Sequence, residues 1–132
     1  MTAIDTAPFL GLPHASITLA SASVTRQNIL RAAGVDFNVV STAIDEARVR
    51  ADAQAGDMAA DEIAVFLAFL KAQTASQILL PSQSPNKSSY IIGCDQLLLI
   101  NDHIMAKPES LAAAKQQLLI LAGKQHELLS AI

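Results

Sequence analysis

The chain contains few of the residues on which disulfide-linked and zinc-thiolate proteins depend. Its 132 residues include one cysteine, Cys94, and no tryptophan. A single cysteine excludes an internal disulfide and a cysteine-rich zinc site, and it fits a reducing compartment. The three histidines, His14, His103 and His126, show no metal-ligand spacing, so we expect no zinc site.

Charged residues are also scarce, and neither sign forms a block. The chain has 9 basic and 12 acidic residues and a formal net charge of -3. Without a basic patch, it is not expected to bind a nucleic acid polymer. Because 52% of the residues are hydrophobic and 16% are charged, we predict a globular domain rather than a disordered chain.

No hydrophobic run is long enough for a membrane-spanning helix. The run AVFLAFL at residues 64–70 ends at Lys71, far short of the roughly 20 residues that a span requires. The N-terminal residues include Asp5, Pro8 and Pro13 and have no basic start, which is unlike a signal peptide. The sequence therefore predicts a soluble cytoplasmic protein without membrane association.

What the chain does have is an alternation of strand-like and helix-like segments. Strands are expected over 16–20, 35–40, 91–100, the segment after the turn at 101–102, and 125–132. Helices are expected over 24–33, 60–79 and 109–121, a polar loop over 43–57 and a turn-rich connector over 81–89. This order predicts an α/β fold, in which ligand sites lie where a strand ends and a helix begins.

The long helix over 60–79 is predicted to bury one apolar stripe. Its apolar residues fall at helical spacing: Ile63, Phe66, Leu67, Leu70 and Ile78. Such spacing indicates a helix that packs its apolar side against a sheet.

The segment LASASVTR at residues 19–26 joins the first strand to the first helix and is a candidate anion site. Backbone N–H groups at a helix N-terminus bind anions, and the hydroxyls of Ser21 and Ser23 with the guanidinium of Arg26 would strengthen such a site. The alternative is a serine N-cap beside a solvated arginine. On these residues alone the alternative is favoured, because the spaced glycines of a P-loop are absent.

The run IIGCDQLLLI at residues 91–100 places a carboxylate, Asp95, within a hydrophobic strand. A buried carboxylate is costly unless it is paired or used. Asp95 is therefore a candidate general base or metal ligand. An aspartate bonded to the backbone at a strand bulge is an equally weighted alternative. Its neighbour Cys94 is predicted to be a small core residue rather than a nucleophile.

Two further groups have both a functional and a structural interpretation. Asp45 and Glu46 form an acidic pair that could hold magnesium, although two solvated acids are favoured in isolation. Lys71, beside the apolar stripe, and Lys107, before Pro108, could each bind a phosphate, although a single lysine is usually solvated.

Taken in order, these motifs resemble a known family over residues 17–132. LASASVTR, the tripeptide IDE at 44–46, LKA at 70–72, GCDQ at 93–96, AKP at 106–108 and HELLSAI at 126–132 follow one another. They are similar to the L-A-S-x-S-P-R-R, I-D-E, K-A, G-A-D-T, K-P and S-G-x-x-H-E-V motifs of the Maf family of nucleoside triphosphate pyrophosphatases. The match is specific because several unrelated short motifs recur in the same order.

The resemblance implies both a fold and a reaction. The fold is a mixed, elongated sheet flanked by helices, with a nucleotide-binding cleft of the Maf and inosine-triphosphatase kind. Residues 16–132 would form the N-terminal portion of a single Maf-like domain, residues 1–15 an N-terminal extension, and the C-terminal lobe would be missing. Maf proteins hydrolyse pyrimidine or modified nucleoside triphosphates to the monophosphate and pyrophosphate, with Mg²⁺ or Mn²⁺, and many are homodimers.

The resemblance also assigns roles residue by residue. Asp95 matches the catalytic aspartate, which accepts the proton of water, and with Glu46 it matches the acids of the metal site. The residues that match phosphate-binding positions are Ser21, Ser23, Arg26, Lys71 and Lys107.

The chain departs from the family pattern at three places. Val24 and Thr25 replace the proline and first arginine of P-R-R, and Gln96 replaces the threonine after the aspartate. Thr25 and Gln96 match positions that influence substrate choice, so a particular base preference is not carried over. The chain also stops at Ile132, where family members continue. A truncated, non-catalytic relative with a nucleotide-binding or interaction role is therefore the alternative to an active enzyme.

Overall fold

The fold is described from a computed structural model, which describes residues 16–82 and 88–132. The predicted N-terminal extension over 1–15 and most of the predicted connector therefore lie outside the described residues. The chain forms two compact units. Unit 1 comprises the described residues up to Ile44 together with Phe69–Gly93, and unit 2 comprises Asp45–Ala68 and Cys94–Ile132.

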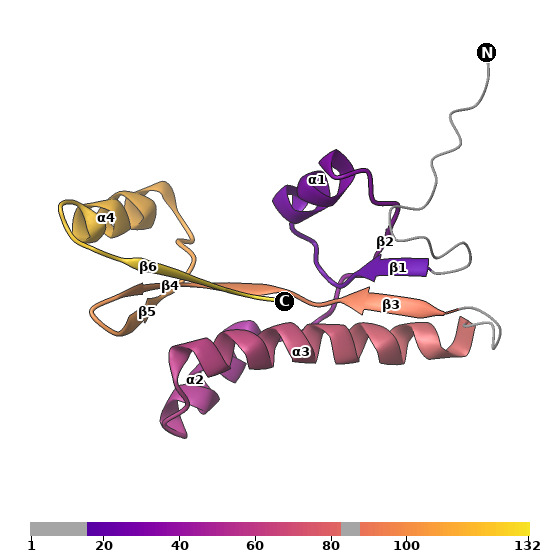
Figure 1. The fold of residues 1–132 in the computed structure, drawn as a ribbon. Coiled ribbons are helices and arrows are strands. Elements are labelled where there is room, and N and C mark those ends of the chain that lie inside the picture. The colour runs from indigo at the N-terminus through magenta and orange to yellow at the C-terminus, as the bar shows by residue number, and fades with distance from the viewer. Residues whose placement is uncertain (1–15, 83–87) are drawn as a thin grey trace, which may run out of the picture. The chain divides into compact units, whose positions relative to one another are not determined.

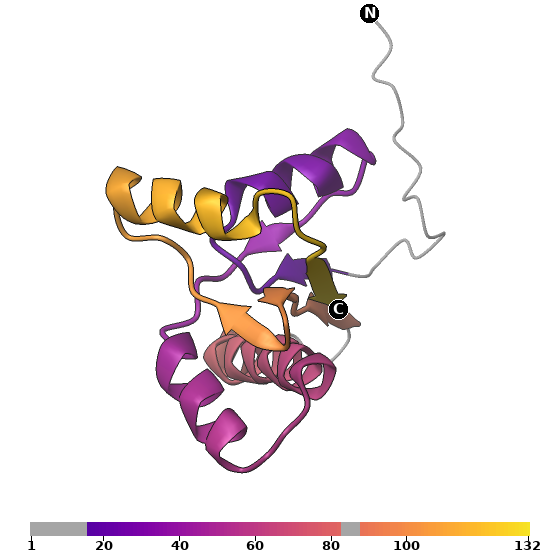
Figure 2. The same ribbon diagram turned by 90° about the vertical axis from the view of Figure 1, so that its left-hand side faces the viewer.

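Unit 1 contains a three-stranded parallel sheet in the order β2-β1-β3. Its elements are β1 (Ser16–Leu19), α1 (Val24–Ala32), β2 (Asn38–Val39) and β3 (Ser89–Ile92). Helix α1 lies over one face of this sheet, and the part of α3 that belongs to unit 1 lies over the other (Figures 1 and 2). Strands β1 and β3 are in register from Ser16 opposite Ser89 to Leu19 opposite Ile92, so their carboxyl ends meet at the same edge.

Unit 2 contains a three-stranded antiparallel sheet in the order β5-β4-β6. Its elements are α2 (Glu46–Ala55), the first part of α3 (Ala60–Leu79), β4 (Asp95–Ile100), β5 (His103–Met105), α4 (Leu111–Leu121) and β6 (Glu127–Ala131). Helices α2 and α3 lie on one side of the sheet and α4 on the other (Figures 1 and 2). Helix α3 continues into unit 1 and is followed by a short 3₁₀ turn, Leu80–Ser82.

The α/β class and most of the predicted elements are confirmed. Helix α3 has the predicted bounds, and α1 ends at the predicted glycine, since Gly34 has a left-handed φ of 71°. The turn at 101–102 is formed by Asn101 and Asp102, with φ of 47° and 62°. Asp102 thus takes a left-handed conformation, which short polar side chains tolerate.

The predicted loop over 43–57 is wrong, because ten of these residues form α2. Asp45 caps the helix by accepting a 3.0 Å hydrogen bond from the backbone N–H of Arg48. Gly56 follows as the C-cap. On the helix, Val49 and Ala53 pack against the core of unit 2. The apolar side of α2 consists mainly of these two small side chains. Because the segment is otherwise polar, hydrophobic periodicity does not predict the helix.

The predicted single strand over 91–100 is also wrong, because the chain leaves one sheet and enters another within it. Strand β3 ends at Ile92 in the sheet of unit 1, and β4 begins at Asp95 in the sheet of unit 2. Gly93 and Cys94, both buried, connect them. Asp95 is therefore the first residue of a strand rather than a residue in the middle of one.

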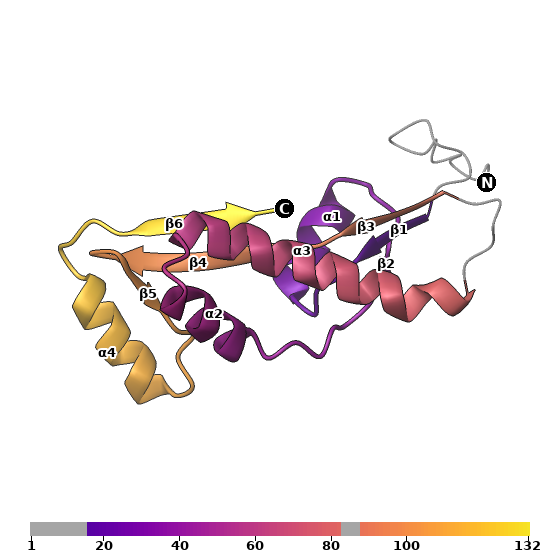
Figure 3. The same ribbon diagram turned by 90° about the horizontal axis from the view of Figure 1, so that it is seen from below.

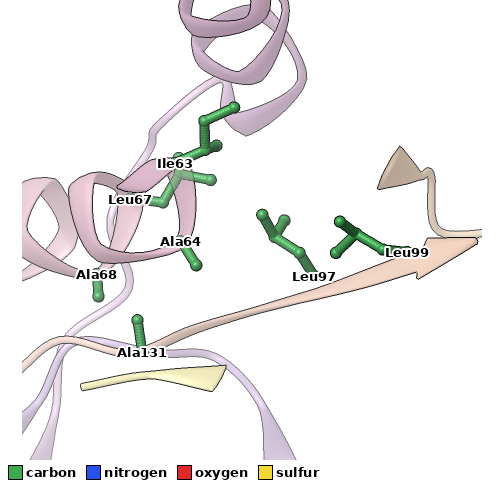
Figure 4. Packing of buried hydrophobic residues seen from close by; sticks show 7 residues of the cluster. All are labelled: Ile63, Ala64, Leu67, Ala68, Leu97, Leu99 and Ala131. Atoms are coloured by element: carbon green, nitrogen blue, oxygen red, sulfur yellow. The ribbon is translucent and has the colours of Figure 1, made fainter. Parts of the chain in front are cut away.

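The buried side of α3 differs from the predicted stripe. Ile63 and Leu67 are fully buried, but Phe66 is 41% exposed and Ile78 is exposed too. The core of unit 2 is formed by Ile63, Ala64, Leu67 and Ala68 of α3 with Leu97, Leu99 and Ala131 of the sheet (Figure 4). The alanines let the helix approach the sheet closely, and the phenylalanines lie on the other side.

Helix α4 and strand β6 leave much apolar surface uncovered. Helix α4 has no buried residue, and Leu118 and Leu119 are exposed. Among the residues that the structure describes, β6 pairs with β4 alone and is therefore an edge strand, and Leu128 on it is exposed. Figure 3 shows β6 along the edge of β4. Across residues 16–82 and 88–132, no helix has the length and apolar character needed to span a bilayer.

Candidate functional site

The turn between β1 and α1 brings Ser21, Ser23 and Arg26 together. Ser21 is buried, and its Oγ accepts hydrogen bonds from the backbone N–H of Ser23 at 3.2 Å and from Arg26 Nη1 at 3.3 Å. Ser23 is the N-cap of α1, because its Oγ accepts a 3.4 Å hydrogen bond from the backbone N–H of Arg26. The predicted serine N-cap is therefore formed by Ser23, and the arginine beside it is held by Ser21 rather than left fully solvated.

This turn has the features of an anion site. It follows the carboxyl end of β1 and opens the nine-residue helix α1. The partial positive charge of a helix N-terminus and a half-buried guanidinium both favour a phosphate oxygen. Thr25, which matches the first arginine of the P-R-R motif, lies in the first turn of α1 and is exposed.

Lys71 is not the solvated lysine that its sequence context favoured. It lies on the unit 1 part of α3 and is only 5% exposed, one helical turn from Ala68 and Ala75 on the same buried side. An ammonium held at this depth is expensive to desolvate, so its position favours a specific role over a surface one.

In unit 2, Asp95 is the most deeply buried acid among the described residues. It is 5% exposed, and its Oδ2 atom is fully buried. It lies opposite Ala131 in a regular antiparallel register that continues along β4, so it does not lie at a bulge. Because side chains alternate along a strand, Asp95 shares a face of β4 with the core residues Leu97 and Leu99.

Gln96 points from the opposite face of β4 and is exposed. Its Nε2 donates a 2.8 Å hydrogen bond to Ser130 Oγ, the residue directly across on β6. The amide is therefore held in one orientation by a cross-strand partner. Sequence analysis did not identify Ser130, which is the penultimate residue of β6.

The acidic pair Asp45–Glu46 divides into two roles. Asp45 is engaged as the N-cap of α2, whereas Glu46 begins the helix and carries its carboxylate at the N-terminal end. Arg50, one turn later, lies with its Nη1 3.8 Å from Glu46 Oε2. Sequence analysis did not identify Arg50, because it predicts a loop over 43–57. The Glu–x–x–x–Arg spacing would have indicated the pair on a helix.

Lys107 lies in the loop between β5 and α4 and is exposed. The residue before it is fixed, since Gln117 Nε2 donates a 2.7 Å hydrogen bond to the carbonyl of Ala106. This bond ties the loop to α4. Lys107 is thus a cation at a solvent-facing position on an anchored loop, which is compatible with either of its sequence interpretations.

A magnesium ion fits these residues only as a partner of phosphate. Within residues 16–82 and 88–132 no group of three or more His, Cys, Asp or Glu residues could hold a metal ion. Mg²⁺ typically takes one or two carboxylates and completes its shell with water and substrate phosphates. Glu46 and Asp95 are the two carboxylates that the family resemblance assigns to such an ion.

Comparison with known proteins decides the family. Residues 16–132 match the family model described as Maf-like protein. The chain belongs to the Maf family. The family matched is the one that the motifs in residues 17–132 resemble.

Among the curated Maf relatives, two illustrate the range of names. A protein of Brucella abortus named 7-methyl-GTP pyrophosphatase is 36% identical over 116 residues, which cover 88% of this chain and 55% of the relative. A protein of Hyphomonas neptunium named nucleoside triphosphate pyrophosphatase is 38% identical over 117 residues, 89% of this chain and 55% of the relative. The chain thus spans about 55% of the length of the curated relatives it matches.

Proposed function

We propose that this Maf-family chain hydrolyses nucleoside triphosphates to the monophosphate and pyrophosphate. The observation that carries the proposal is Asp95, a carboxylate that is 5% exposed at the first position of β4. The names of the relatives from Brucella abortus and Hyphomonas neptunium support this class of reaction. A protein that needed only a folded strand here would more commonly bury an apolar residue.

In the proposed mechanism, Asp95 accepts the proton of the water that attacks the α-phosphorus. A carboxylate on a strand within a packed core keeps one orientation, which general-base catalysis requires. Glu46 and Asp95 would hold Mg²⁺ or Mn²⁺. When bound, such an ion neutralises charge on the phosphates and on the departing pyrophosphate.

The phosphate-binding roles fall to the remaining predicted cations and hydroxyls. The hydroxyls of Ser21 and Ser23 shape the turn, and Ser21 holds the Arg26 guanidinium, which we propose binds a phosphate oxygen. Lys71 and Lys107 are proposed to stabilise charge on the triphosphate. A lysine buried to 5% exposure supports a role of this kind for Lys71.

We propose that the substrates are pyrimidine or modified nucleoside triphosphates, with Thr25 and Gln96 influencing which base is accepted. The Brucella abortus relative is named for a methylated guanosine triphosphate, which supports modified nucleotides as a class. The hydrogen bond that holds Gln96 to Ser130 supports a role in recognition, because a fixed amide can select a pattern of donors and acceptors.

A second candidate function is a non-catalytic nucleotide-binding or interaction role. Its support is that Thr25 occupies a position of the β1–α1 turn at which the family motif has an arginine, so one cation for phosphate binding is absent. We also propose a homodimer, supported by the open edge of β6 and the exposed Leu128. A cytoplasmic location is proposed from the single cysteine.

The decisive experiment measures pyrophosphate release from a panel of canonical and modified nucleoside triphosphates with Mg²⁺ or Mn²⁺. Asp95→Asn is expected to lower the rate by about 10²- to 10⁴-fold, the usual contribution of a general base. Asp36→Asn, at an exposed position between α1 and β2, is the matched control and should retain the wild-type rate. No release by folded wild type would reject hydrolysis and favour the binding role.

A further inference from the structure

Helix α2 carries two arginines in ion pairs of identical spacing but different surroundings. Arg48 Nε lies 3.7 Å from Asp52 Oδ2, and these side chains are 79% and 75% exposed. Arg50 Nη1 lies 3.8 Å from Glu46 Oε2, and these side chains are 22% and 40% exposed. The first pair has the environment of an ordinary surface pair, which contributes little. The second is partly enclosed.

The difference follows from the positions of the residues around the helix. At about 100° per residue, Glu46 and Arg50 fall on the same side of α2 as Val49 and Ala53. Val49 and Ala53 pack against the core of unit 2. Arg48 points about 120° away from the direction of Val49 and Ala53, and its partner Asp52 is exposed as well. The apolar stem of Arg50 therefore lies beside the core, while its guanidinium reaches back one turn towards Glu46.

The arginine of the enclosed pair is more buried than its acid. Arg50 is also the only basic residue of unit 2, in which Asp45–Ala68 and Cys94–Ile132 are all described, that is not exposed. Arg50 is thus the more enclosed side chain of the pair, at 22% exposure against 40% for Glu46. Its contact restricts the rotamers of Glu46, a long side chain at the first position of α2.

We propose that Arg50 is a positioning residue, which holds the Glu46 carboxylate in the orientation used for metal and substrate. The inference rests on the proposed function, because it takes Glu46 to be an acid of that site. Loss of a residue that orients a ligating carboxylate typically lowers metal affinity or activity by about 10- to 100-fold. Arg50 acts only through Glu46, so its effect must vanish when Glu46 is neutralised.

A double-mutant cycle tests this dependence. The variants are Glu46→Gln, Arg50→Gln and the two together, with Arg50→Lys as the conservative variant and Arg48→Gln as the matched control. Two quantities are measured for each folded variant: kcat/KM for pyrophosphate release, and the Kd of α,β-methylene-UTP with Mg²⁺ by titration calorimetry. The second readout needs no turnover.

We expect Glu46→Gln and Arg50→Gln each to change these quantities by about 10- to 100-fold. The double variant should be no worse than the more severe single variant, since residues acting as one unit are not additive. Arg50→Lys should recover part of the loss, and Arg48→Gln should resemble wild type.

The outcomes separate this inference from the proposed function. The positioning role alone would be overturned if wild type hydrolyses the nucleotide and the losses of the two single variants add in the double variant. It would also be overturned if Arg50→Gln is as active as Arg48→Gln. Nucleotide binding without hydrolysis, with the same non-additive cycle in Kd, would overturn the proposed hydrolysis and support Arg50. Neither binding nor hydrolysis by folded wild type would overturn both.

Discussion

Replacing Ser21 with alanine should separate the structural role of the β1–α1 turn from its role in binding. Ser21 Oγ accepts two hydrogen bonds, one from the backbone N–H of Ser23 and one from Arg26 Nη1. Alanine removes both acceptor sites while keeping the backbone and most of the volume. The variant therefore releases the guanidinium without deleting it.

The cost in stability can be worked out from these two bonds. A neutral hydrogen bond contributes about 0.5–1.5 kcal/mol and one to a charged group about 1.5–3 kcal/mol. At 3.2 and 3.3 Å both are longer than the usual distance, so we take the lower ends, roughly 2 kcal/mol together. For a chain of 132 residues this predicts a fall in Tm of about 6–10 °C.

The assay combines urea unfolding with steady-state pyrophosphate release. We expect Ser21→Ala to raise KM for the triphosphate at least about tenfold, because an unanchored arginine must be ordered on binding. Ser110→Ala is the control: Ser110 caps α4 through a 3.1 Å bond from the Ala113 N–H. It should cost about 1 kcal/mol and leave KM unchanged. An unaltered KM in destabilised Ser21→Ala would refute phosphate binding by this turn.

Three further changes test the core, the base-reading position and the sheet edge. Leu67→Ala should lower the free energy of unfolding in urea by about 3–5 kcal/mol, because Leu67 is fully buried. Phe69 is exposed, so Phe69→Ala should lower it by less than about 1 kcal/mol. Equal losses would contradict the orientation of α3. Gln96→Ala should change the ratio of kcat/KM between two nucleotides by about tenfold or more. Ser130→Ala should change this ratio in the same direction. An equal loss of kcat/KM for every base would argue against base recognition by Gln96. Leu128→Lys should convert a dimer to a monomer in light scattering, since an edge-strand lysine disfavours strand pairing; an unchanged mass would place the dimer contact elsewhere.

Much of the fold could be predicted because local patterns and tertiary packing agree. Helix α3 has apolar residues at helical spacing over 20 residues and acids in its first turn. The turn at 101–102 has two residues that tolerate a left-handed backbone. Helix α2 could not be predicted from hydrophobic periodicity, because only Val49 and Ala53 of it pack against the core. Its evidence lies in side-chain spacing and in the Asp45 cap instead.

The candidate site was partly predictable for a similar reason. Residue types identified the turn at Ser21 and Arg26, and the structure adds the hydrogen bonds that join them. Burial could not be deduced for Lys71 from its neighbours in sequence, because the buried side of α3 is marked by alanines and not by the phenylalanines. A row of alanines along a helix is compatible with a close contact to a sheet and also with an exposed surface. The sequence alone therefore does not show which side of α3 is buried.

The break at Gly93–Cys94 has consequences for how β4 can serve a site. Because β4 starts at Asp95, its alternation puts Asp95 on the face shared with Leu97 and Leu99, and Gln96 on the other. A one-residue shift in register would exchange these faces, burying an amide and exposing the carboxylate. The paired Gln96 and Ser130 oppose such a shift, since their 2.8 Å bond forms only when the two strands are in this register. We therefore expect Gln96 to favour the register that buries Asp95, besides the recognition role proposed for it.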